Sequence, residues 1–295
     1  MKLITVFTPA YNRAFCLDQL YISLIGQTNQ DFKWLIIDDG SSDNTRGLVQ
    51  SWMDEAKIEI QYIYQDNQGM HGGHNTAYKN IDTELNVCID SDDFMPLDAI
   101  EKILKFWKKN ENNNVAGIIG LDAYQNGNII GCKIPDSIKY SRLNDLYNIH
   151  NVTGDKKLVL RTEVVKEFPA YPIYESEKLV PLGTLYLMID SKYEFLCLNE
   201  VLCIVEYLED GSSRNIFKQY RKSPRGFGYA RIVKMKYSSS LKVKFNAAVQ
   251  LVSSAIFAKR IKLLFESPYP FLTLIAIPFG ILLSIYIVFK TRKNN

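Results

Sequence analysis

Short apolar runs alternate with stretches of helical periodicity through the first half of the chain. The runs WLII at 34–37 and NVCI at 86–89 lack two-residue alternation, which is typical of strands covered on both faces. The pattern predicts strands at Leu3–Thr8, Trp34–Asp38, Ile58–Tyr64, Leu85–Asp90 and Ala116–Gly120, and helices at Ala14–Gly26, Thr45–Ala56, Gly73–Asn80 and Pro96–Lys109. Such alternation favours an α/β fold with a mostly parallel, Rossmann-like central sheet flanked by helices.

The pattern continues less regularly from Asp122 onwards. Strand-like runs are expected at Lys157–Leu160, Phe195–Leu198 and Val201–Tyr207, with one helix at Pro181–Ile189. Proline leads this helix, as it leads the one at Pro96–Lys109, because the first helical residue needs no backbone N–H donor. We expect one domain over residues 1–213, in which about 1–125 bind one substrate and about 126–213 bind the other.

Three polar clusters follow predicted strands of the first half. They are TPAYNR at 8–13, DDGSSDNT at 38–45 and DSDD at 90–93. Ligands of parallel sheets gather at the carboxyl ends of the strands. We therefore expect the three clusters to share one cleft.

The DSDD cluster places three carboxylates within four residues. Asp90, Asp92 and Asp93 repel one another, and a divalent cation would offset that repulsion. Oxygen ligands of this kind suit Mg²⁺ or Mn²⁺, with substrate phosphates completing the coordination shell. A solvated acidic loop that leads into the next helix explains the same residues.

The other two clusters suggest nucleotide recognition. Asp43 or Asn44 explains an ordinary helix cap, but capping does not require Asp38 and Asp39. A carboxylate at a strand end can accept hydrogen bonds from a base or from ribose hydroxyls, and Tyr11 could stack on a base. A plain turn between strand and helix is the alternative for the cluster at 8–13.

Taken together, FTPAYNRA, QTNQDFKWLIIDDGSSDNT and IDSDD resemble the family 2 glycosyltransferases of the GT-A fold. The resemblance covers residues 1–125 and continues more weakly to about 213, where ESEKLVP and EYLEDGSS are similar to a bacterial subgroup that makes surface polysaccharides. It implies a nucleotide-sugar donor, a divalent metal (Mg²⁺ or Mn²⁺) and inversion at the anomeric carbon. The donor is expected to be a UDP-sugar, and the enzyme a hexosyl- or N-acetylhexosaminyltransferase.

The resemblance also assigns residues to the donor. Thr8, Tyr11 and Asp39 match positions that contact the base and its surroundings, and Asp38 is expected beside them. Asp90 and Asp92 match the ends of the DxD motif, with Asp92 as the metal ligand, Ser91 between them at the donor and Asp93 shaping the loop. The family often carries a basic residue before Asn75; His74 stands there, and we expect it at the donor without a metal role, although His71 is close by.

Direct displacement with inversion requires a base on the acceptor side. Family members supply an Asp or Glu from the second half of the domain, and the matching candidate is Glu177, with Glu175 as the alternative. A base must reach the acceptor hydroxyl. An acid at the N-terminus of the following helix is the competing explanation for Glu177.

Charge divides the chain at residue 213. Residues 1–213 carry 19 Lys and Arg against 31 Asp and Glu, whereas residues 214–295 carry 16 against 1. The following uncharged run Phe271–Phe289 is 19 residues long, close to the ~20 that cross a bilayer core. A basic segment next to such a run favours an anionic membrane over nucleic acid.

The C-terminal part is expected to form a basic helical region at 214–265 and an apolar anchor at 266–295. Pro278 and Gly280 interrupt the apolar run, which favours a re-entrant hairpin over a span. For the uncharged stretch between Lys244 and Lys259, a helix on the membrane surface and a helix packed on the catalytic domain both fit. The five cysteines, odd in number and in apolar surroundings, are expected to be buried, reduced thiols in the cytosol.

The sequence therefore predicts a membrane-attached inverting glycosyltransferase at the cytosolic face of the cytoplasmic membrane. Its acceptor is expected to be a lipid-linked glycan or a surface polysaccharide. A polyprenyl-phosphate glycosyltransferase is the alternative enzyme. A catalytically silent membrane scaffold with the same fold is the alternative outside enzymes, and intact Asp39, Asp90 and Asp92 argue against it.

Overall fold

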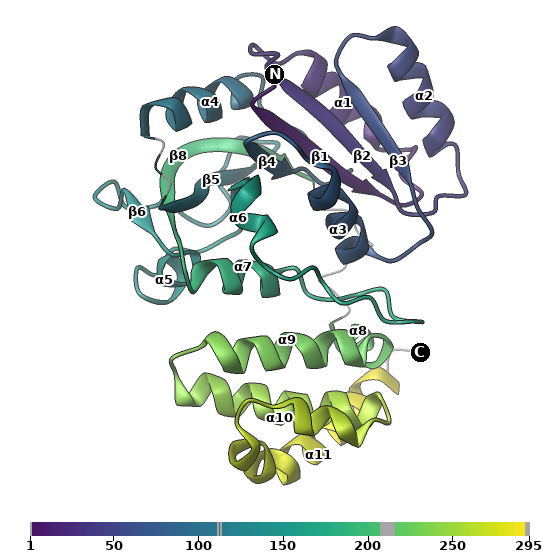
Figure 1. Cartoon of the computed structure of the whole chain (residues 1–295), viewed down its shortest axis with the longest axis vertical. Coiled ribbons are helices and arrows are strands. Elements are labelled where there is room, and N and C mark those ends of the chain that lie inside the picture. Colours follow the sequence, from purple (N-terminus) through teal and green to yellow (C-terminus); the bar gives the residue numbers. More distant parts are fainter. Residues whose placement is uncertain (1, 111, 113, 207–215, 293–295) are drawn as a thin grey trace. The chain divides into compact units, whose positions relative to one another are not determined.

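A computed structural model of the chain describes residues 2–110, 112, 114–206 and 216–292. Within these residues an eight-stranded sheet has the strand order β3-β2-β1-β4-β7-β5-β8-β6, with helices on its faces (Figure 1). The strands are β1 (Ile4–Ala10), β2 (Phe32–Asp38), β3 (Ile60–Tyr64), β4 (Leu85–Cys88), β5 (Val115–Tyr124), β6 (Tyr140–Ser141), β7 (Lys156–Arg161) and β8 (Glu194–Val205). The expected α/β class is confirmed.

The sheet is parallel in its first half and mixed in its second. β1 pairs in parallel with β2 and β4, and β2 pairs in parallel with β3. β7 enters between β4 and β5 and runs antiparallel to both, whereas β8 is parallel to β5. The runs expected as two strands at 195–198 and 201–207 belong to β8, which keeps its pairing with β5 through register shifts; Tyr207 lies outside the described residues.

The helices of the sheet region are α1 (Leu17–Ile25), α2 (Thr45–Glu55), α3 (Met70–Asn80), α4 (Ala99–Asn110), α5 (Leu143–Asn148) and α6 (Thr162–Lys166). The first four follow the expected order, whereas α5 and α6 were not predicted from the sequence. Apolar residues of α1 recur at i, i+3, i+4 and i+7 and are buried. There Tyr21 stacks on Trp52 with ring centroids 4.4 Å apart, and Trp52 lies 5.7 Å from Trp34 of β2.

The expected proline start of α4 is wrong, because α4 begins at Ala99 and not at Pro96. The side chain of Gln27, and not the proline, bonds the backbone at the start of α4. Its Nε2 donates to the Pro96 carbonyl at 2.8 Å, and its Oε1 accepts from the Ile100 amide at 3.1 Å. A residue distant in sequence thus satisfies the first turn of the helix.

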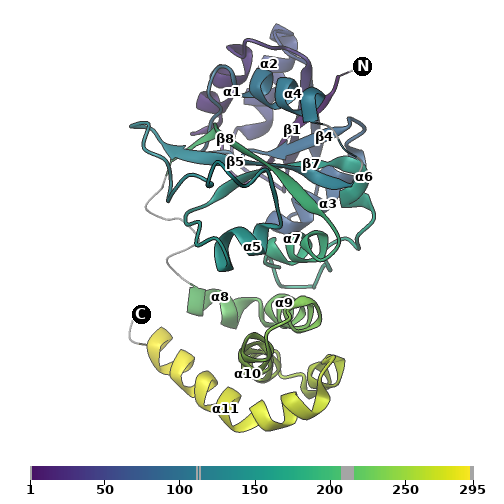
Figure 2. The same ribbon diagram turned by 90° about the vertical axis from the view of Figure 1, so that its left-hand side faces the viewer.

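The chain forms two compact units whose boundaries differ from those expected. The first comprises Met1–Asn67, Gly72–Pro169 and Lys192–Leu208, and the second comprises Gln68–His71, Ala170–Ser191 and Glu209–Asn295. The second unit contains α7 (Gly183–Asp190), α8 (Ile216–Lys222), α9 (Pro224–Tyr237), α10 (Leu241–Phe257), the 3₁₀ helix η2 (Ile261–Glu266) and α11 (Pro270–Arg292) (Figure 2). The segment 170–191, which we expected in the first domain, therefore belongs with the C-terminal helices, and α7 begins at Gly183 rather than Pro181.

The apolar run is one helix, so the expected hairpin is contradicted. α11 continues through Pro278 and bends near its middle, as Figure 2 shows. A row of small residues packs on α10: a Cβ atom on Gly280 would lie 2.4 Å from Cβ of Val252, and Ser284 donates to Ser253 at 3.0 Å. Close helix packing at these positions, rather than a turn, accounts for the glycine.

The helix expected near 244–259 is α10. Ala247, Ala248 and Leu251 are buried in a cluster with residues of α9, η2 and α11. Ser253, which belonged to a polar stripe in the sequence, faces Ser284 of α11. α10 is therefore an interior helix of the second unit.

All five cysteines lie within the described residues and are free thiols, as expected. Cys203 is buried, and Cys16, Cys88 and Cys197 are partly buried. The expectation of burial is wrong for Cys132, which is exposed.

Candidate functional site

The loops that follow β1 and β2 are tied together by hydrogen bonds. Asn12 adopts a positive φ of 52°, and its Oδ1 accepts from the Ser42 amide at 2.8 Å. Its own amide donates to Ser41 Oγ at 2.8 Å, and the Ala14 amide donates to Asp43 Oδ2 at 3.0 Å. The structure thus brings the first two polar clusters together at the carboxyl ends of neighbouring strands.

Asp38 and Asp39 are both buried, but they have different partners. Asp38 Oδ1 accepts from the Ser41 amide at 2.8 Å, and its Oδ2 accepts from the Tyr62 hydroxyl. Burial, followed by this carboxylate, raises the pKa of Tyr62. Asp39 Oδ1 accepts from Gln65 Nε2 at 2.7 Å. Asp38 holds the turn, and its contact with a donor stays a prediction, as does that of Asp39.

The backbone at the next residue, Gly40, leaves no room for a side chain. Its φ is +85°, and a Cβ atom there would lie 2.9 Å from the Asn67 amide nitrogen. A left-handed conformation with so close a contact favours glycine.

Asp38→Asn should lower the free energy of unfolding by about 1–3 kcal/mol, because the Tyr62 hydroxyl loses a charged acceptor inside the core. Urea unfolding of Asp38→Asn, Tyr62→Phe and the double variant should show coupling between the two sites. A variant that keeps full stability but loses nucleotide binding would instead place Asp38 at the donor.

The remaining sequence-predicted donor residues of this region differ in exposure. Thr8 is buried, and its Oγ1 accepts from Trp34 Nε1 at 3.0 Å. His74 is also buried, with its ring 5.1 Å from that of Phe7 and 5.8 Å from that of Tyr78. Tyr11 is 50% exposed. Of these three, Tyr11 alone presents its side chain to a ligand in this state, and donor contacts of Thr8 and His74 stay predictions.

The acidic loop follows β4 and is fastened to the end of β8. Asp93 is buried, and it accepts from the Glu206 amide at 3.1 Å and from Cys203 Sγ at 3.6 Å. Phe94 and Ile204 exchange two backbone hydrogen bonds of 3.0 and 2.7 Å. These contacts agree with the expectation that Asp93 shapes the loop.

Asp90 is exposed, Ser91 is buried and Asp92 is partly buried. Burial and then the Asp90 charge raise the pKa of Asp92, while the Arg13 charge lowers it. Burial raises the pKa of the Cys16 thiol, and the Ser91 side chain and the charges of Arg13, Asp92 and Glu206 also act on this pKa. The third cluster therefore lies close to the loop after β1.

A partly buried cation acts electrostatically on the acidic loop. Lys157 of β7 has its Nζ 3.9 Å from Asp122 Oδ1 of β5. Burial opposes the charge of Lys157, but Cys203, Asp122, Asp90 and Asp93 together raise its pKa. Burial raises the pKa of Asp93 to about 7 in spite of Lys157. Lys157 thus offsets part of the repulsion among the loop carboxylates.

Sequence reasoning missed several members of this cluster. Arg13 stood in the first polar cluster and Glu206 in EYLEDGSS, but neither was assigned a role. No local signal marks Lys157 and Asp122, because antiparallel pairing of β7 with β5 brings them together.

The acidic loop fits a hard divalent cation. Among the described residues no group of three metal-ligating side chains is preassembled. Mg²⁺ is usually held by one or two protein carboxylates together with substrate phosphates and water. Asp90 and Asp92 are the candidate pair. Burial and then the Asp90 charge raise the pKa of Asp92, and a bound cation would relieve the repulsion between the two carboxylates.

Glu177 lies in the second unit and anchors the start of α9. Its Oε1 accepts from the amide and Nε of Arg225 at 3.1 and 2.9 Å, and its Oε2 accepts from the Gly226 amide at 2.9 Å. Arg225 also lies 4.9 Å from the Tyr174 ring centroid and donates to the Glu175 carbonyl. The competing explanation placed Glu177 at the N-terminus of the helix that follows it in sequence, whereas its partners lie in the first turn of α9. Its role as a base stays a prediction.

Solved structures of other proteins have a similar fold. S. aureus TarS 1–349 in complex with UDP-GlcNAc has a TM-score of 0.62 at 15% identity, covering 100% of this chain and 93% of that chain. The mannosyltransferase PcManGT from Pyrobaculum calidifontis, in complex with GDP-Man and Mn²⁺, has a TM-score of 0.54 at 14% identity, covering 96% and 87%. At such identities the likeness concerns the fold alone.

Sequence comparison finds curated relatives that match about a third of this chain. An uncharacterized glycosyltransferase of Haemophilus influenzae is 31% identical over 110 residues, which is 37% of this chain and 44% of that protein. The putative teichuronic acid biosynthesis glycosyltransferase TuaG of Bacillus subtilis is 31% identical over 106 residues, 35% of this chain and 41% of that protein. The match thus spans less than half of the length of these relatives.

The sequence model of glycosyl transferase family 2 matches residues 5–167. This range is more than half of the chain and contains all three polar clusters. It also contains the strands β1, β2 and β4 that carry them. The resemblance noted in the sequence is therefore confirmed, and the chain belongs to glycosyl transferase family 2.

Proposed function

We propose that this protein transfers a sugar from a UDP-sugar to a lipid-linked glycan or surface polysaccharide, with the help of a divalent cation. The observation that carries the proposal is the acidic loop Asp90–Asp93, which lies beside the loop after β1. Within the described residues, the carboxylates of Asp90 and Asp92 form no ion pair of 4 Å or less. The solved structure of S. aureus TarS with UDP-GlcNAc and the name of TuaG support the donor and acceptor classes.

The roles of the donor residues follow from their positions. Asp92, with Asp90, would hold Mg²⁺ or Mn²⁺, which neutralises the charge of the leaving nucleoside diphosphate. Tyr11 is exposed for stacking on the base. Asp39 is the candidate acceptor for base or ribose donors. Arg13 lies near Asp92 and adds positive charge where the diphosphate would sit.

Inversion by a single displacement requires one base that takes the proton of the acceptor hydroxyl. Glu177 is the candidate from the sequence, but both of its oxygens accept hydrogen bonds from α9, which must open before it can reach a hydroxyl. Glu206 acts electrostatically on Asp92 and is held beside the acidic loop by its backbone. Glu206 is therefore the competing candidate for the base.

Thermal unfolding with nucleotides tests the donor assignment. UDP with Mn²⁺ should stabilise the full-length protein by about 2.7 kcal/mol at 100 times its dissociation constant. EDTA should remove this stabilisation, and CDP and GDP should give less. Absence of stabilisation by any nucleotide diphosphate would favour the silent scaffold with this fold.

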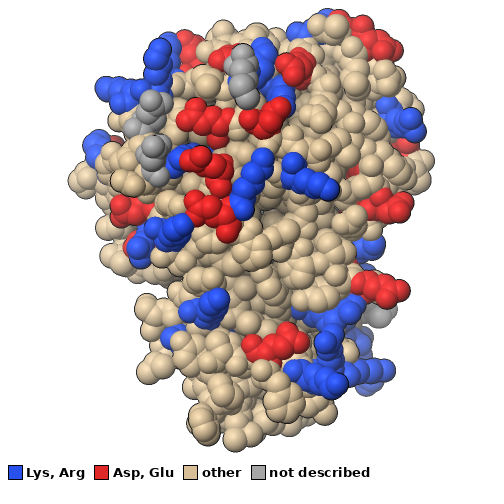
Figure 3. All heavy atoms as spheres, in the orientation of Figure 1, with Lys and Arg blue, Asp and Glu red and all other residues tan. Residues whose placement is uncertain are grey.

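Membrane attachment is part of the proposal and rests on the outer face of α11. By length and composition this helix is the candidate membrane span among the described residues, and 28% of its most apolar 18-residue stretch is buried. Leu274, Leu282 and Ile285 are each more than 60% exposed. Figure 3 shows, on one face, Lys and Arg side chains beside a broad area without charge where these C-terminal helices lie. Both features suit an anionic membrane.

Full-length protein in membranes should resist extraction with 1 M NaCl and dissolve in detergent. Burial of apolar surface is not weakened by salt, whereas exposed ionic attraction is screened over about 3 Å at 1 M ionic strength. Replacing Leu274, Leu282 and Ile285 together by Gln should make the protein extractable by salt. Recovery of the unchanged protein in the salt-washed fraction would contradict attachment through α11.

A further inference from the structure

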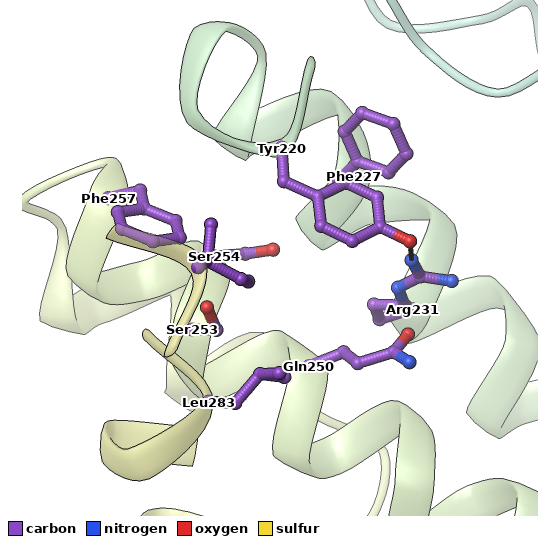
Figure 4. Close-up of a pocket in the computed structure, with 9 residues that line it drawn as sticks. Tyr220, Phe227, Arg231, Gln250, Ser253, Ser254, Phe257 and Leu283 are labelled. Carbon is purple, nitrogen blue, oxygen red and sulfur yellow. Dashed lines mark hydrogen bonds between the residues drawn. The ribbon is translucent and has the colours of Figure 1, made fainter. Parts of the chain in front are cut away.

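A pocket opens among the C-terminal helices, and none of the residues that line it is assigned to the donor. Its wall includes Tyr220 of α8, Arg231 of α9, Gln250 and Ser253 of α10 and Leu283 of α11 (Figure 4). It is open to the surface and has an empty volume of about 230 Å³. Its enclosed part has room for about one water molecule.

Among the described residues, the partners of the Arg231 guanidinium are neutral. Its Nη2 donates to the Tyr220 hydroxyl at 3.1 Å, and its central carbon lies 5.5 and 5.8 Å from the ring centroids of Tyr220 and Phe227. Its Nε is buried and has no hydrogen-bond partner among the residues that the structure describes. Buried cations in proteins are normally paired with an anion.

The charge of Arg231 is not compensated within the described part of the chain. Burial lowers its pKa, and the opposing influence comes from Tyr220 rather than from a carboxylate. One turn further along α9, burial and the Arg231 charge lower the pKa of Lys234. Lys234 is exposed to solvent, so within the described residues Arg231 is the cation here with a buried nitrogen and no anionic partner.

The remaining wall of the pocket supplies polar groups and an apolar edge. Gln250 extends toward Arg231, whereas Ser253 lies farther from Arg231, beside Ser254 (Figure 4). Leu283 and Ile287 belong to α11, whose adjoining residues Leu282 and Ile285 are 65% and 61% exposed. The α11 residues that line the cationic pocket are thus neighbours in sequence of residues on the exposed apolar face of the same helix.

We propose that this pocket binds the phosphate group of a lipid phosphate ester. One phosphate oxygen enters the enclosed space and accepts from Arg231 Nε, while the rest of the group stays at the mouth near Gln250. Guanidinium groups bind phosphate oxygens with charge-assisted hydrogen bonds. The acyl chains lie along the exposed face of α11. The pocket does not use the donor site, so this inference stands or falls independently of the transferase activity.

Binding is tested on full-length protein in maltoside detergent without donor or metal. Isothermal calorimetry with dioctanoyl phosphatidic acid should give a dissociation constant at least tenfold below that of inorganic phosphate, and dioctanoylglycerol should not bind. Phosphate binding as tightly as phosphatidic acid would overturn the lipid assignment, and diacylglycerol binding as tightly would overturn the phosphate assignment.

Variants separate the pocket from general charge attraction. Arg231→Gln should weaken phosphatidic acid binding at least tenfold, and Arg231→Lys should weaken it less. Lys242→Gln removes an exposed charge of the same unit and should leave binding unchanged. Because Arg231 is uncompensated, its replacement by Gln should not lower the melting temperature without ligand. Equal losses from Arg231→Gln and Lys242→Gln, or full binding by a folded Arg231→Gln, would overturn the proposal.

Discussion

Asp92→Asn is expected to lower the rate of sugar transfer by roughly 10²–10³-fold, because a bound cation contributes several kcal/mol of charge stabilisation and each 1.4 kcal/mol is worth a factor of ten. The variant should also lose the stabilisation that UDP gives in the presence of Mn²⁺. Transfer rates under saturating donor and thermal unfolding with UDP, each with and without Mn²⁺, measure the two effects.

The same variant should remain folded. Burial and Asp90 raise the pKa of Asp92, so an uncharged side chain relieves repulsion, and the melting temperature without metal should hold or rise. Asp54→Asn, at an exposed position of α2, is the matched control and should leave transfer unchanged. Full metal-dependent stabilisation by UDP in Asp92→Asn would remove this residue from the metal site.

Glu177→Gln is expected to lower the free energy of unfolding by about 1.5–3 kcal/mol, the usual contribution of hydrogen bonds to a charged group. The amide has one acceptor oxygen in place of two, and it cannot satisfy Arg225 and Gly226 together. Urea unfolding measures the loss. Glu175→Gln is the control, since the Glu175 side chain is exposed and its carbonyl is the group that Arg225 contacts.

The same variants identify the base. Loss of a general base commonly costs about 10²–10⁴-fold in rate while donor binding is kept. We expect this pattern for Glu206→Gln. The limb of the pH–rate profile that reports protonation of the base, the fall in rate at low pH, should disappear in this variant. A stable Glu177→Gln that binds UDP but does not transfer sugar would return the role to Glu177.

Much of the sheet could be predicted from local patterns. β1, β2 and β4 are short apolar runs followed by polar clusters, and the parallel arrangement of their ends followed from strand and helix alternation. The grouping of the clusters at 8–13 and 38–45 is confirmed by the hydrogen bonds of Asn12. The strands depend on residues close to one another in sequence, and the grouping of the clusters follows from the parallel pairing of β1 with β2.

The sequence-based predictions failed where contacts between residues distant in sequence determine the local structure. Gln27 sets the start of α4, and Glu206 and Cys203 fix Asp93 from the far end of the sheet region. Pro278 and Gly280 suggested a turn, but Gly280 serves the close approach of α11 to Val252. Glu177 matched a catalytic position by pattern, whereas its partners on α9 are invisible in the sequence.

UDP release from a set of UDP-sugars is the most direct measurement of the proposed activity. Full-length protein with Mn²⁺ should release UDP from at least one UDP-sugar, and EDTA or Asp92→Asn should suppress the release. If no UDP-sugar is turned over and UDP binding is the same with Mn²⁺ and with EDTA, the metal-dependent transferase is contradicted.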